Sequence, residues 1–125
     1  MATDGARILV VDDDVPIREL LVSVLTESGY TVIEAAHGAA ALDLLADTSV
    51  DLVISDVMMP LLDGVRLCQQ VKETWQTACI LMSSAPQQQS LVAGADAFIA
   101  KPFDLDRFEH VVESVLKANA PDDAR

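Results

Sequence analysis

The chain has 125 residues, of which 51% are hydrophobic and 22% are charged, and these proportions are typical of a single globular domain with a buried core. Twenty acidic residues against eight basic ones give a formal net charge of −12, which argues against direct nucleic-acid binding because the phosphate backbone would be repelled. No run of about 18 apolar residues could span a bilayer and no secretory signal is recognisable, so we expect a cytoplasmic protein without a membrane segment.

The first predicted unit is a strand followed by a helix. Ile8–Val11 is a short run rich in β-branched residues, typical of a strand buried on both faces. Apolar residues then recur at helical spacing from Ile17 to Leu25, with Pro16 near the first turn and Gly29 just past the end.

The same alternation continues along the chain. Further strands are predicted at Thr31–Ala35, Leu52–Ser55, Ala78–Met82 and Ala97–Ala100, and further helices at Ala39–Ala46, after Asp63 as N-cap, and around Phe108–Leu116. Apolar strands that alternate with helices predict an α/β fold, in which a doubly wound parallel sheet of five strands carries helices on both faces. We expect this domain to span residues 1–120 and the last residues, 121–125, to be a frayed tail.

The residues just after the predicted strands carry charged or hydroxyl groups. They are Asp12, Asp13 and Asp14 after the first strand, Asp56 after the third, Ser83 and Ser84 after the fourth, and Lys101 after the fifth. In parallel sheets these strand ends share the edge where ligands bind. Carboxylates that lie close together repel one another unless a cation joins them, and Mg2+ prefers carboxylate and phosphate oxygens. An aspartate can also attack phosphorus, so the pattern predicts a Mg2+-dependent phosphoryl site in which Lys101 helps to neutralise charge.

Four segments resemble, in order and approximate spacing, those of bacterial response-regulator receiver domains. The segments are ILVVDDD, DLVISDVMMPLLDG, ILMSSA and AFIAKPF, and the resemblance covers nearly the whole chain. It implies a flavodoxin-like strand order of 2-1-3-4-5 and a phosphoacceptor switch of a two-component system, one that promotes its own phosphorylation and dephosphorylation without being an enzyme in the usual sense. The implied partners are a sensor histidine kinase or a histidine phosphotransfer protein as donor, and a downstream protein as target.

The resemblance also implies roles for individual side chains. Asp56 would be the phosphoacceptor, and Mg2+ would be bound by Asp12, Asp13, Asp56 and the backbone carbonyl of Met58, with Asp13 the most direct ligand. Lys101 would pair with the phosphoryl group.

A second set of implied roles concerns the conformational response. Ser84 would be the hydroxyl that moves toward the phosphoryl group, and Phe98 the aromatic side chain whose rotamer follows. Only thirteen residues, Ala85 to Ala97, separate these two positions, which is close to the minimum of about 10–12 residues for a parallel crossover. We therefore expect a shortened fourth helix and a nonstandard surface for reading out the phosphorylated state.

Two other functions fit parts of the same sequence. The run from Asp12 to Val15 also resembles the DxDxV motif of haloacid-dehalogenase-type phosphatases, in which Asp12 would be the nucleophile. Alternatively, the chain could be a degenerate receiver that acts as a binding module without phosphorylation. The intact set of acidic, hydroxyl and lysine residues argues against the latter.

Overall fold

The structure, a computed structural model, describes residues 5–84 and 94–119. Strands and helices alternate in the order β1 (Arg7–Val11), α1 (Val15–Glu27), β2 (Thr31–Ala35), α2 (Gly38–Asp47), β3 (Leu52–Asp56), α3 (Gly64–Trp75), β4 (Ala78–Ser83), β5 (Ala97–Ala100) and α4 (Leu105–Ala118). All five strands pair in parallel in the order β2-β1-β3-β4-β5. The predicted fold class and strand order are therefore confirmed. The predicted short helix between Ser84 and Phe98 falls mainly on residues 85–93 and lies outside the described residues.

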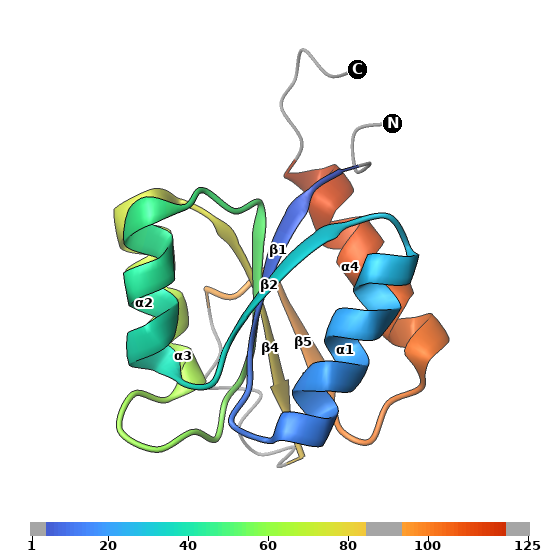
Figure 1. Cartoon of the computed structure of the whole chain (residues 1–125), viewed down its shortest axis with the longest axis horizontal. Coiled ribbons are helices and arrows are strands. Elements are labelled where there is room, and N and C mark those ends of the chain that lie inside the picture. Colours follow the sequence, from blue (N-terminus) through green and yellow to red (C-terminus); the bar gives the residue numbers. More distant parts are fainter. Residues whose placement is uncertain (1–4, 85–93, 120–125) are drawn as a thin grey trace.

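The sheet separates two hydrophobic clusters, one under each pair of helices. Helices α1 and α4 cover one face, and α2 and α3 cover the other (Figure 1). Along β1, Ile8 and Val10 contribute to the first cluster while Leu9 contributes to the second, because successive side chains of a strand point to opposite faces. Both cysteines, Cys68 and Cys79, are buried in the second cluster. Burial on both faces explains why the central strands β1, β3 and β4 are largely apolar.

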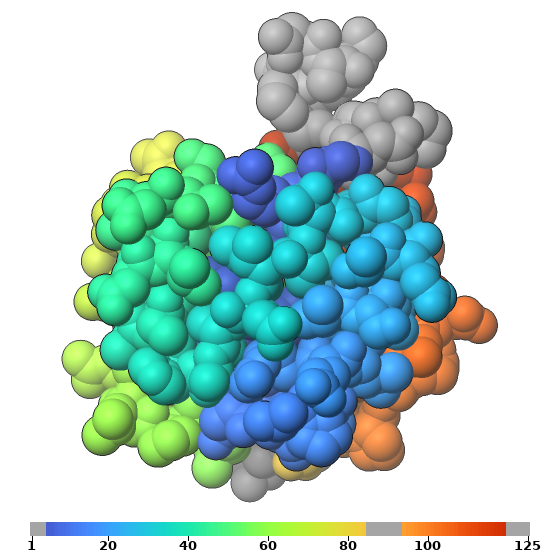
Figure 2. All heavy atoms as spheres, in the orientation of Figure 1, coloured from blue at the N-terminus to red at the C-terminus, as the bar shows by residue number. Residues whose placement is uncertain are grey.

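The edge strand β2 is the most exposed part of the sheet. Its residues lie at the surface between α1 and α2, where they form the cyan region of the space-filling view (Figure 2). Within the parts of the chain that the structure describes, no helix has the length and apolar character needed to cross a membrane.

Aspartate side chains start three of the four described helices. Each accepts a hydrogen bond from a backbone N–H of the first turn: Asp14 from Ile17 at 3.2 Å, Asp63 from Arg66 at 2.9 Å and Asp104 from Arg107 at 2.6 Å. His37 caps α2 in the same way through Nδ1, at 3.2 Å from the nitrogen of Ala40. Such caps fix where each helix begins, and so they determine where the loop between each strand and the next helix ends.

Asp96 fixes the point where the chain re-enters the sheet before β5. Its Oδ2 accepts hydrogen bonds from the backbone N–H of Cys79 at 2.8 Å and from Lys72 Nζ at 2.6 Å. Its own backbone N–H donates to the carbonyl of Cys79 at 2.8 Å. These contacts join the start of β5 to β4 and α3. Because β5 then pairs with β4 along its whole length, the same pairing sets the position of Lys101 just after the end of β5.

Candidate functional site

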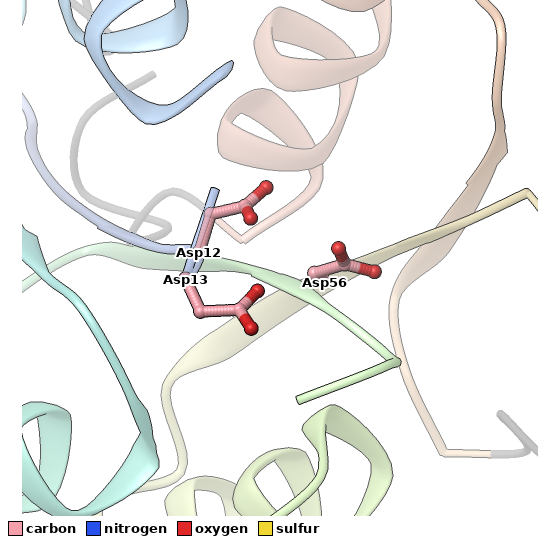
Figure 3. Close-up of side chains that lie close together, drawn as sticks. All are labelled: Asp12, Asp13 and Asp56. Carbon is pink, nitrogen blue, oxygen red and sulfur yellow. The ribbon is translucent and has the colours of Figure 1, made fainter. Parts of the chain in front are cut away.

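Three carboxylates converge at the carboxyl ends of neighbouring strands. Asp12 and Asp13 follow β1, and Asp56 is the last residue of β3, which pairs with β1. One oxygen from each of the three side chains lies within 4.8 Å of the other two. Figure 3 shows the carboxyl groups of Asp12 and Asp13 directed toward Asp56. The strand-end prediction thus placed these three side chains correctly, because the parallel register brings the strand ends to one edge.

Asp12 is fully buried and is fixed on three sides. Its backbone N–H donates to the carbonyl of Ala35 at 3.2 Å, its carbonyl accepts from Arg18 Nη1 at 2.8 Å, and its Oδ1 accepts from the N–H of Asp14 at 2.9 Å. Its Oδ2 is buried and has no hydrogen-bond partner within the described residues. The nearest ion-pair partner of Oδ2 there is Lys101 Nζ, at 3.8 Å. A buried carboxylate oxygen without a partner is costly, and a cation in the cluster would satisfy it.

Lys101 links β5 to the acidic cluster. Its Nζ donates to Asp56 Oδ2 at 3.1 Å, and Asp56 Oδ1 accepts from the backbone N–H of Met58 at 3.2 Å. The side chains of Asp56 and Lys101 are only 13% and 19% exposed, so water screens this pair weakly. Three carboxylates against one ammonium still leave an excess of two negative charges when all are ionised. That excess matches the charge of one divalent cation.

The pKa of Asp12 reflects both its burial and the charges around it. Burial raises the pKa of this carboxyl above its ordinary value, and the negative charges of Asp56 and Asp13 raise it further. The hydrogen bond from Asp14 and the charge of Lys101 act in the opposite direction without cancelling the effect of burial. The folded protein therefore holds the ionised form of Asp12 at a cost in stability when no cation is bound.

Replacing Asp12 by asparagine is expected to raise the Tm in chelator-containing buffer near neutral pH, by the equivalent of about 1–3 kcal/mol. Asparagine keeps an oxygen for the Asp14 N–H and removes the buried charge. Because the pKa of Asp12 is higher in the folded state than in the unfolded state, the folded protein binds this proton more tightly. The cost of ionising Asp12 is therefore absent below pH 3.8. It develops as the pH rises through the pKa of the folded state. Thermal unfolding followed by circular dichroism from acidic to neutral pH measures the difference. An Asp12→Asn variant that is less stable than the native chain at neutral pH without Mg2+ would contradict this.

The other predicted site residues lie around the cluster. Ser84 is exposed and follows β4 directly, at the same edge of the sheet. Met58 lies in the loop after β3 and is 60% exposed, and its backbone N–H donates to Asp56. Phe98, in β5, is partly buried and packs against the cluster under α2 and α3. Met58 thus contacts Asp56, Ser84 lies at the same edge of the sheet, and β4 separates Phe98 from the strand that carries Asp56.

Two residues that shape the site were not singled out for it from the sequence. Arg18 reaches from α1 to the carbonyl of Asp12, a contact between elements that no local pattern signals. Gly64, the first residue of α3, packs so closely that a Cβ there would collide with the backbone carbonyl oxygen of Asp56 and lie 2.9 Å from Val57 Cα. A glycine directly after the N-cap Asp63 was the available signal for this close approach.

An acidic cluster and a lysine at the carboxyl edge of a five-stranded parallel sheet define the class of α/β domains to which the receiver domains belong. Residues 8–113 match the family model of the response regulator receiver domain. The chain therefore belongs to this family, the receiver domains of two-component response regulators, and the resemblance inferred from the sequence is confirmed.

Curated relatives and solved structures support the same assignment. Response regulator MprA from Mycobacterium sp. (strain KMS) is 42% identical over 122 residues, which cover 94% of this chain and 53% of that protein. The chain thus spans about half the length of the curated relatives it matches. The response regulator TrrA from Thermotoga maritima, solved in complex with Mg(2+)-BeF, is 33% identical with a TM-score of 0.83, covering 88% of this chain and 98% of that one. Chemotaxis protein CheY4 from Vibrio cholerae is 29% identical with a TM-score of 0.81 and the same coverage.

Proposed function

We propose that this chain is a phosphoacceptor switch in which Asp56 takes a phosphoryl group from a phosphohistidine in a Mg2+-dependent reaction. One observation carries the proposal. The buried, unpartnered Oδ2 of Asp12 belongs to a three-carboxylate cluster whose member Asp56 is already bound by Lys101. Added positive charge stabilises such a cluster, and a phosphoryl donor supplies the anion that this charge and the ammonium then bind.

The residues present fit a magnesium ion. Asp12, Asp13, Asp56 and the backbone carbonyl of Met58 would bind it, since these are hard oxygen ligands and Asp12 Oδ2 lacks another partner. The Mg(2+)-BeF complex of the similar protein TrrA supports the choice of metal. When bound, Mg2+ neutralises charge on the oxygens of the transferring phosphoryl group.

The chain's own groups prepare Asp56 for transfer. The Met58 N–H and Lys101 Nζ each contact one carboxylate oxygen, so the carboxylate is oriented before the donor arrives. A carboxylate oxygen of Asp56 forms the new bond to phosphorus as the bond from phosphorus to the donor imidazole nitrogen breaks, and that nitrogen takes up a proton. Lys101 then pairs with the phosphoryl oxygens and the Ser84 hydroxyl donates to one of them. As the Ser84 hydroxyl moves, Phe98 changes its rotamer, and the two packings are two conformations whose populations shift.

The geometry favours Asp56 over Asp12 as the nucleophile. Asp12 is fully buried, whereas Asp56 keeps 13% of its side chain exposed. A phosphatase that attacks through Asp12 would need its buried carboxylate to reach a substrate. The receiver mechanism requires no such movement.

The proposal extends to partners and organisation. The donor is a sensor histidine kinase or a histidine phosphotransfer protein, and the output is a downstream protein target. The net charge of −12 disfavours direct nucleic-acid binding by these residues. The chain is proposed to promote its own phosphorylation and dephosphorylation rather than to act on a separate substrate, as one cytoplasmic receiver domain over residues 1–120 followed by a tail at 121–125.

Intact-mass analysis after incubation with a small phosphodonor tests the proposed function. We expect one phosphoryl adduct per chain with Mg2+ and a rate of formation at least about 100-fold lower with a chelator, because the carboxylates would otherwise repel the donor. A chain that forms no adduct with Mg2+, or forms it equally well with the chelator, contradicts the proposal.

A further inference from the structure

We infer that Arg18 is a positioning residue for the magnesium site, a role that rests on the proposed function. Arg18 lies in the first half of α1, and its side chain is 15% exposed. Nη1 donates to the backbone carbonyl of Asp12 at 2.8 Å, and Nε donates to Glu34 Oε1 in β2 at 2.8 Å. One guanidinium therefore joins α1, the end of β1 and the edge strand β2.

The contact with Asp12 fixes the part of the backbone that carries two proposed ligands. The carbonyl of Asp12 belongs to the planar peptide unit that connects Asp12 to Asp13. The hydrogen bond to this oxygen therefore fixes the orientation of the peptide plane from which both side chains extend. On the other side of Asp12, its N–H is held by Ala35 at 3.2 Å. The side-chain Oδ1 is held by Asp14, and only the unpartnered Oδ2 is left for the cation.

Glu34 offsets the positive charge of Arg18, which lies close to the proposed Mg2+ site. A free guanidinium near the three carboxylates would oppose the binding of Mg2+ by repulsion. The carboxylate of Glu34, 47% exposed, offsets the charge of Arg18, and the rigid fork of the guanidinium keeps a second N–H directed at the Asp12 carbonyl. The Arg18–Glu34 pair thus has little net charge, while Arg18 still donates its hydrogen bond to Asp12.

Positioning and simple electrostatics predict opposite signs for the same substitution. If Arg18 acted only by its charge, Arg18→Met would tighten Mg2+ binding and Arg18→Lys would leave it unchanged. If Arg18 positions the acidic turn, Arg18→Met weakens Mg2+ binding by about 10- to 100-fold, the usual range for groups that orient metal ligands. Arg18→Lys, which keeps the charge but loses the fork, weakens it as well, by about 10-fold.

Calorimetric titration of the full chain with MgCl2 measures these affinities. The matched control is Arg7→Met, which removes the same charge at the opposite end of β1, where Arg7 contacts Ser49, and should bind Mg2+ like the native chain. Hydrogen exchange at the Asp14 amide gives a second readout. This amide donates to Asp12 Oδ1, and its exchange should be faster in both Arg18 variants even without Mg2+.

The outcomes separate this inference from the proposed function. If the native chain binds no Mg2+, the proposed function and the inference both fail. If the native chain binds Mg2+ and forms the phosphoryl adduct while Arg18→Lys binds Mg2+ as tightly as the native chain, the inference alone is overturned. Arg18→Lys keeps the buried stem and the charge, so it remains decisive if Arg18→Met does not fold.

Discussion

Replacing Asp56 by asparagine is expected to abolish phosphoryl incorporation from a small phosphodonor with Mg2+, to the background of the assay. Asparagine is nearly the same shape and keeps an oxygen for the Met58 N–H, but it has no carboxylate to attack phosphorus. The loss should therefore be complete rather than partial. Intact-mass analysis reports the adduct, and circular dichroism verifies that the variant is folded.

Asp12→Asn is the matched control, since it makes the same chemical change within the same cluster. This variant should still form the adduct, although more slowly because one proposed Mg2+ ligand is changed, and peptide mapping should place the adduct on Asp56. The reverse pattern, in which Asp12→Asn loses the label and Asp56→Asn keeps it, would show that Asp12 is the nucleophile and that the chain works as a phosphatase-type enzyme.

Replacing Gly64 by alanine is expected to lower the free energy of unfolding by about 1–3 kcal/mol, the usual cost of inserting an atom into closely packed surroundings. The added Cβ would meet the backbone of Asp56 and Val57, which cannot rotate away as a side chain can. Gly64 also donates its N–H to the carbonyl of Val57 at 3.0 Å, so the loop after β3 is held on both sides. Because Asp56 itself must move, phosphoryl incorporation should slow as well. Urea unfolding and the mass assay measure the two effects.

Gly38→Ala provides a control of the same kind, because Gly38 is also the first residue of a helix. There the added Cβ would meet the side chain of Leu62 at 2.7 Å, and a flexible side chain can move aside. Its cost should stay below about 1 kcal/mol, since alanine also favours the helix. Equal effects of the two substitutions on stability would argue against the backbone collision at Gly64.

Much of the fold was predictable because its determinants are local. Apolar strands and 3.6-residue periodicity gave the elements in their order, and Asp63 was correctly predicted as an N-cap. Predicted strand ends fell short by one residue at Asp56 and Ser83, since parallel pairing extends both strands beyond their apolar runs. The clustering of the carboxylates followed from the rule that parallel strands end at one edge.

The contacts that refine the site were not predictable, because they join distant parts of the chain. Arg18 and Glu34 lie on different elements, and in the sequence they look like ordinary charged surface residues. The hydrogen bonds of Asp96 to Cys79 and Lys72 likewise depend on how α3 packs on β4. Such pairs become visible only when the register of the strands and the rotation of the helices are known.

The aspartate-capped helix starts have a consequence for the ions that the site can accept. Helices α1, α3 and α4 follow β1, β3 and β5 along the chain, so their N-termini lie toward the edge that carries the acidic cluster. The aligned peptide dipoles give each N-terminus a partial positive charge equivalent to about half a proton charge. This partial charge comes from the backbone and is therefore present whether or not an ion is bound. The edge that carries the carboxylates therefore also has positive backbone charge, which would favour the phosphorylated form proposed for Asp56.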